Sequence, residues 1–114
     1  MNTNLLYQII DHILKHPEEF DMSWWHCGTT YCIARRACQL AGENGPATSM
    51  GHRATKLLQI TSDQAHSLFH VTNWPHAFSH AYYANYGKLT SKELQQHKAE
   101  VTAKRIQHFI LTGE

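Results

Sequence analysis

The densest group of reactive side chains lies between positions 24 and 34, which read Trp-Trp-His-Cys-Gly-Thr-Thr-Tyr-Cys-Ile-Ala. Cys27 directly precedes an expected helix, whose N-terminal N–H groups favour a thiolate, and His26 is its neighbour in sequence. Cys32 lies four residues before Arg36, so a helix would bring a guanidinium near its sulfur and lower the thiol pKa. Cys27, Cys32 and His26 are therefore the candidate catalytic residues. With a distant histidine, they are also candidates for metal binding.

A structural role is the competing interpretation of these cysteines. Cysteine is among the most buried residue types and often acts as a small apolar side chain. The separations of five residues from Cys27 to Cys32 and six from Cys32 to Cys38 do not match the close Cys-x-x-Cys pairs of structural zinc sites. An odd number of cysteines also argues against a disulfide framework. The balance favours buried thiols and no catalytic activity.

The chain is histidine-rich, and three pairs of its ten histidines are spaced four residues apart, so that each pair shares one face of a helix. The pairs are His12/His16, His66/His70 and His76/His80. No glutamate follows the first histidine of any pair, so the His-Glu-x-x-His motif of zinc proteases is absent. Surface histidines are the favoured interpretation, and we expect no metal and no cofactor. The weak metal candidates are His66, His70, His76 and His80.

Aromatic residues and one arginine are the candidate binding residues. Trp24, Trp25 and Trp74 could line a groove for a partner, because such side chains dominate binding hot spots. Arg36 falls on the polar side of its expected helix, together with Arg35 and Gln39. In so small a domain, packing between helices is the favoured role of the tryptophans.

The elements that must position these residues are helical, because apolar side chains recur at steps of three and four residues and no stretch alternates as a strand does. We predict an all-α, compact single-domain bundle of five to six helices over residues 1–114, with an internal loop at 42–50. The expected helices are Asn4–His16, a second from 28–30 to Gly42, Arg53–Gln59, a fourth after the capping box at 61–64, a fifth from 74–75 to Asn85, and a sixth from the capping box at 90–93 to Leu111.

Charge and hydropathy exclude several classes of partner. The net charge is +1, which gives no general attraction to nucleic acid or to a membrane surface. We find no secretory segment and no membrane-spanning run, and a reduced, cytoplasmic setting is the expectation. Residues 54–69 suggest a helix-turn-helix, but Gln59 occupies the turn position and the second helix carries Asp63 and no Arg or Lys. Nucleic-acid binding is therefore the weaker alternative.

The whole chain resembles a family of small bacterial and phage-encoded proteins that has no established activity. Short motifs spread over nearly the full length carry the resemblance: His-Pro-Glu-Glu-Phe-Asp-Met at 16–22, Cys-Gly-Thr-Thr-Tyr-Cys-Ile-Ala at 27–34, Ala65 with Leu68-Phe69, Trp74-Pro75, and Arg-Ile-Gln-His-Phe-Ile-Leu-Thr-Gly at 105–113. The chain departs from the family at Arg35-Arg36, where the family has a small residue followed by a larger one. The resemblance indicates where a site would lie and implies no particular chemistry.

The sequence thus favours a non-catalytic binding module that binds a second copy of itself or another protein, away from membranes. The alternative is a Cys/His site centred on Cys27 and Cys32 that binds metal or performs thiol chemistry. The two hypotheses differ in one property, the accessibility and pKa of these two thiols.

Overall fold

The computed structural model describes residues 1–20, 22, 32–43, 49–85 and 87–114. These ranges contain six α-helices and two short 3-10 helices, and they contain no β-strand. The all-α fold expected from the sequence is confirmed. The elements are α1 (Thr3–Lys15), η1 (Pro17–Glu19), α2 (Ile33–Leu40), α3 (Met50–Leu58), α4 (Ser62–Phe69), η3 (Val71–Asn73), α5 (His76–Tyr83) and α6 (Ser91–Thr112). None of the helices within these ranges is both long enough and apolar enough to cross a membrane.

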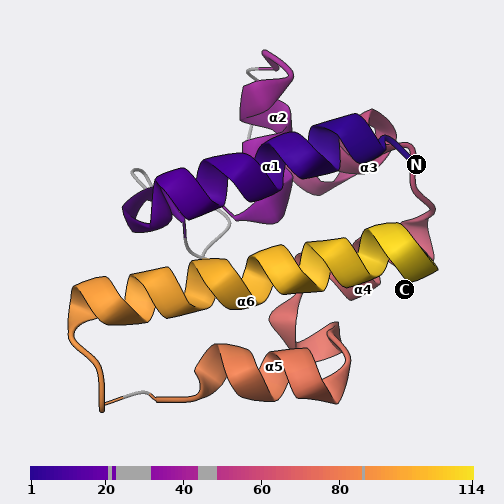
Figure 1. Cartoon of the computed structure of the whole chain (residues 1–114). Coiled ribbons are helices and arrows are strands. Elements are labelled where there is room, and N and C mark those ends of the chain that lie inside the picture. Colours follow the sequence, from indigo (N-terminus) through magenta and orange to yellow (C-terminus); the bar gives the residue numbers. More distant parts are fainter. Residues whose placement is uncertain (21, 23–31, 44–48, 86) are drawn as a thin grey trace.

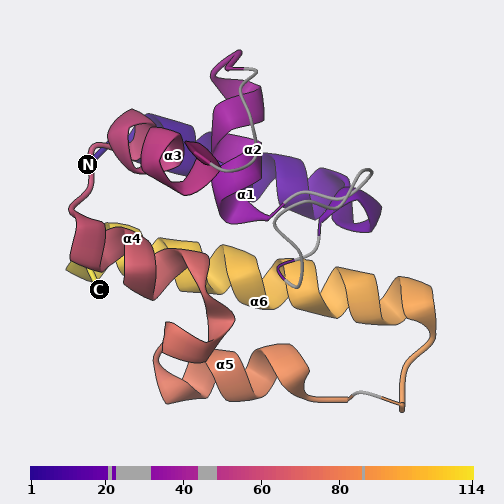
Figure 2. The same cartoon turned by 180° about the vertical axis from the view of Figure 1, so that it is seen from behind.

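Helix α6 is the central element of the fold. It runs between α1 on one side and α5 on the other, antiparallel to α1, and this order is the same in both views (Figures 1 and 2). Helix α2 crosses α1 steeply, and α3 packs against α2 (Figure 1). Helix α4 lies against the C-terminal half of α6, where Gln64 donates a hydrogen bond to the carbonyl oxygen of Gly113 at 3.1 Å.

Helix α1 forms because its apolar residues share one face and because both of its ends are defined. Leu6, Ile9 and Ile13 are completely buried. The Asn2 side chain caps the helix by accepting a hydrogen bond from the N–H of Leu5 at 3.1 Å, and Pro17 begins the next turn. The observed range differs from the predicted one by a single residue at each end.

Helix α6 buries side chains over a wide arc because other helices pack on two of its sides. The capping box of Thr90 and Glu93 starts the helix as predicted. The sequence predicts an inward set of five apolar residues in this helix, namely Leu94, Val101, Ile106, Phe109 and Ile110. Val101, Ile106 and Phe109 are buried, whereas Leu94 and Ile110 are half-buried. Four further residues are buried in addition to the expected set: Ala99, Thr102, Ala103 and Arg105.

Two helix boundaries that we predicted are wrong. Helix α2 begins at Ile33, because Cys32 has the extended backbone of an N-cap; the expected start at 28–30 lies outside the described residues. Helix α3 begins at Met50, inside the predicted loop, because Met50 packs into the core.

The predicted fifth helix needs two corrections. Helix α5 ends at Tyr83, and Asn85 has a left-handed backbone that a helix cannot include. The sequence also predicts that Ala77 lies on the apolar side of this helix together with Phe78, Ala81 and Ala84. Ala77 is instead exposed, while Tyr82 is buried.

The turn between α3 and α4 stores strain that a substitution should release. Gln59 is exposed and has a φ of 55°, a left-handed backbone that costs a non-glycine residue about 1 kcal/mol. Gln59→Gly should raise the free energy of unfolding by about 0.5–1 kcal/mol in urea denaturation. Gln107→Gly is the matched control, because Gln107 is exposed inside α6; it should lower that energy by about 1 kcal/mol. A change in the free energy of unfolding that has the same sign in both variants would contradict this account.

Candidate functional site

Four of the residues singled out in the sequence, Trp24, Trp25, His26 and Cys27, lie outside the described residues. The described part of the candidate site therefore consists of the residues on either side of this stretch. These are the end of α1, the turn η1 and the start of α2, and they contain Cys32 and Arg36.

Cys32 is a capping residue in the core. Its side chain is 4% exposed, and its sulfur accepts a hydrogen bond from the N–H of Arg35 at 3.4 Å. Burial raises the pKa of the Cys32 thiol. The expectation that Arg36 would lower this pKa is wrong, because the Arg36 guanidinium extends toward α1 and η1 instead.

Cys38 is also a buried, free cysteine, and its thiol donates to the carbonyl oxygen of Met50 at 3.8 Å. Burial raises the pKa of this thiol too. Cys32 and Cys38 therefore stay protonated at neutral pH. This is the structural role that the sequence favoured for them.

Arg36 joins three elements and is 2% exposed, so this candidate binding residue is buried in the protein. Its Nη1 donates to Gln39 Oε1 at 3.0 Å and to His12 Nε2 at 3.3 Å. Its Nη2 donates to the carbonyl oxygen of Glu19 at 3.3 Å. The helical projection placed Arg36 on the polar side correctly, but α1 and η1 cover that side. Arg36 therefore fixes the corner between α1, η1 and α2.

His12 is held neutral by this contact. A guanidinium can only donate hydrogen bonds, so His12 Nε2 must be the acceptor and its ring proton must lie on Nδ1. Burial, and then the positive charge of Arg36, lower the pKa of His12 below its ordinary value of 6.5. The ring also lies beside that of His16, with centroids 5.0 Å apart.

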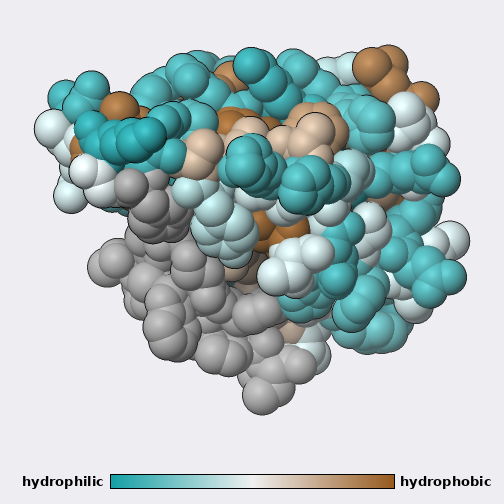
Figure 3. All heavy atoms as spheres, turned by 90° about the horizontal axis from the view of Figure 1, so that it is seen from below, coloured by the Kyte–Doolittle hydropathy of each residue, from teal (hydrophilic) through white to brown (hydrophobic). Residues whose placement is uncertain are grey.

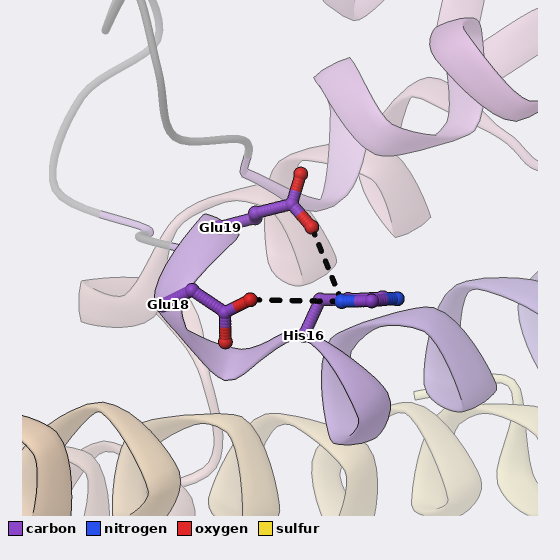
Figure 4. A group of neighbouring side chains, drawn as sticks. All are labelled: His16, Glu18 and Glu19. Carbon is purple, nitrogen blue, oxygen red and sulfur yellow. Dashed lines mark ion pairs between the residues drawn. The ribbon is translucent and has the colours of Figure 1, made fainter.

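His16 lies between two carboxylates at this corner (Figure 4). His16 ends α1, and Pro17 turns the chain into the 3-10 turn η1, which brings Glu18 and Glu19 back to the imidazole. The His16 Nδ1 atom lies 3.5 Å from Glu18 Oε1 and 3.4 Å from Glu19 Oε2. We call these three residues the His16 site.

The spacing within the His16 site suits a small cation. Its ligand atoms all lie within 4.8 Å of one another. The two N···O distances exceed those of ordinary hydrogen bonds, about 2.7–3.2 Å. They match the separation of about 3.4 Å between two ligands that each lie about 2.1 Å from a tetrahedral zinc ion. In the described part of the chain this is the one group of three such ligands.

The histidine pairs predicted as weak metal candidates are neighbours in space but lack a third ligand. Ring centroids are 5.2 Å apart for His66 and His70 and 5.6 Å apart for His76 and His80. No other His, Cys, Asp or Glu of the described ranges completes either pair. Burial, followed by the charge of His66, lowers the pKa of His70.

Trp74 packs inside the protein and does not line an open groove. It is 4% exposed, and its indole N–H donates to the carbonyl oxygen of Leu68 at 2.7 Å. Its ring meets that of Tyr82 edge-on, with centroids 5.5 Å apart. Packing between helices, the favoured role for the tryptophans, therefore holds for Trp74.

The His16 site was not predicted, because histidines at helical spacing do not reveal ligands that a turn brings together. The signal that could have revealed it is a histidine followed by proline and two glutamates. A helix end followed by a tight turn brings residues two and three positions apart onto one side.

Comparisons of the chain with known protein families, with curated proteins and with solved structures gave no match.

Thiol reactivity should follow the burial of the two described cysteines. In a Cys27→Ser variant, Cys32 and Cys38 should react with an aromatic disulfide reagent only as fast as the protein opens, because both are buried and protonated. The measurement is the reaction rate at pH 7 in buffer and in urea. Rapid reaction in buffer, at the rate of a small free thiol, would contradict this.

The His12–Arg36 contact should make stability depend on pH. The folded-state pKa of His12 lies below 6.5, so the unfolded chain binds more protons below that pH. The free energy of unfolding should therefore be fully developed above about pH 6.5 and fall as the pH is lowered. His12→Gln keeps an acceptor for Arg36 but does not titrate, so urea denaturation at pH 7.5 and 5.5 should show a smaller difference. If the difference in the free energy of unfolding between the two pH values is the same in His12→Gln as in the unmodified protein, the role of His12 is refuted.

Proposed function

We propose that this protein is a non-catalytic binding module whose His16 site holds a divalent cation. The observation that carries the proposal is the spacing of one imidazole nitrogen and two carboxylate oxygens, which matches the edge of a tetrahedral coordination shell. We prefer this cation site to the alternative centred on Cys27 and Cys32, although Cys27 lies outside the described residues. Cys32 is buried, and its sulfur serves as a helix cap.

Two carboxylates and an imidazole favour a divalent ion over a monovalent one. The two glutamates supply two negative charges, which a divalent cation neutralises, and the imidazole favours zinc over magnesium or calcium. Arg36 acts as a positioning residue, because its hydrogen bond to the Glu19 carbonyl oxygen holds η1 against α2.

The exposure of the site indicates how the cation serves binding. The three side chains are between 42% and 59% exposed, and three ligands leave a tetrahedral ion one open position. A ligand from another protein, or from a second copy of this chain, completes the shell. In this proposal the cation attaches the module to its partner and performs no chemistry.

The other expectations from the sequence join this proposal. Free Cys32 and Cys38 suit a reducing compartment, so we propose that the protein acts in the cytoplasm. We also propose membership of the family that the sequence motifs resemble, in which the His-Pro-Glu-Glu motif supplies the His16 site.

Zinc titration of metal-free, untagged protein tests the proposal. Calorimetry at pH 7.5 should give one zinc ion per chain, and His16→Ala and Glu19→Gln should each weaken binding by at least about tenfold. His80→Ala is the matched control, because it removes an exposed histidine from a pair that lacks a third ligand; its affinity should equal that of the unmodified protein.

All variants must have the same helix content and the same Tm in the absence of metal, as measured by circular dichroism. Zinc binding that His16→Ala leaves unchanged would refute the site, as would the absence of stoichiometric binding. Size-exclusion chromatography with and without zinc then distinguishes self-association from a requirement for another protein.

A further inference from the structure

Arg105 is a buried cation that lacks a counter-ion among the described residues. It is 0% exposed, and its Nη2 atom donates to Ser67 Oγ at 3.2 Å and lies 3.5 Å from the Ser67 carbonyl oxygen. Its Nε and Nη1 atoms are buried, and no acceptor among the described residues lies within hydrogen-bond distance. Burial lowers the pKa of Arg105 to about 10, so it still carries its charge at neutral pH.

Aromatic rings surround the guanidinium but do not replace an anion. Its central carbon lies 6.0 Å from the centre of the Phe78 ring and 5.8 Å from that of Phe109. Cation–π contacts offset only part of the cost of burying an ion. The helices α4, α5 and α6 thus leave Arg105 with an unsatisfied charge at their junction.

A groove between α5 and α6 is lined in part by Phe78. It has a volume of about 340 Å³ and is lined by Phe78, Ala81 and Val101, with His97, Glu100 and Lys104 around them. On the face that carries α5, small apolar areas lie between hydrophilic side chains (Figure 3). Phe78 is half-buried and contacts both the groove and Arg105. Phe78 is therefore the residue that the groove and the surroundings of the guanidinium share.

We propose that this groove binds a small apolar monocarboxylate, whose hydrocarbon part lies along Phe78, Ala81 and Val101 and whose carboxylate pairs with Arg105. Rotation of the Phe78 side chain about its Cα–Cβ bond opens the path between them. A single guanidinium in an apolar setting neutralises one negative charge, which favours a carboxylate over a doubly charged phosphate. The exposed Lys104 attracts the anion to the groove, and Glu100 opposes it.

Octanoate is the probe for this site, and thermal unfolding in the presence of EDTA is the measurement. The chelator makes the result independent of the proposed cation site. Octanoate at about ten times its Kd, and below its micelle concentration, should raise the Tm of the unmodified protein by about 4–8 °C. Octanol and inorganic phosphate at the same concentration should shift the Tm by less than a quarter of that amount. Equal stabilisation by octanol or by phosphate would overturn the proposal.

Variants at two neighbouring cations identify the residue responsible. Arg105→Met keeps the volume and removes the charge, so the octanoate shift should disappear. Lys104→Met removes the exposed cation and should retain most of the shift. An unchanged shift in Arg105→Met, or loss of the shift only in Lys104→Met, would refute the site. Should Arg105→Met fail to fold, the comparison of octanoate with octanol on the unmodified protein still decides the question.

Discussion

Helix α6 has to bury side chains on two opposite sides at once, and the rest of the fold follows from this constraint. Helix α1 covers one side and α5 the other, while α4 packs on the C-terminal half. Small residues such as Ala99 and Ala103 permit close approach of the neighbouring helices. A helix in this position cannot keep a narrow apolar stripe, so polar Thr102 and charged Arg105 become buried as well.

The two buried arginines represent different solutions to the cost of burying a charge. Arg36 is surrounded by polar groups from α1, η1 and its own helix, and its hydrogen bonds fix the corner that carries the His16 site. Arg105 lies among aromatic rings and has one serine as its described hydrogen-bond partner. The first arrangement stabilises a local structure. In the second, the charge of Arg105 has no counter-ion among the described residues, so an anion that paired with it would be bound favourably.

Local signals in the sequence predicted most of the helices but little of the site. The apolar spacing and caps of α1 and α6 depend on neighbouring residues, so their ranges are right within one or two positions. The burial of Arg36 was not predicted, because a helical projection contains no information about which segment packs on the polar side. The His16 site was missed because it depends on a turn. Such features are decided by tertiary contacts between distant parts of the chain.

The place of α6 in the chain has a consequence for synthesis. A ribosome makes α1 to α5 before α6, so the buried faces of α1 and α5 emerge without the helix that covers them. Contacts between α1 and α6 also close a loop that contains most of the chain, which carries a large entropic cost. The packing of α1 and α5 against α6 therefore forms only after α6 has left the exit tunnel. Until then the apolar surfaces of α1 and α5 that pack on α6 are uncovered.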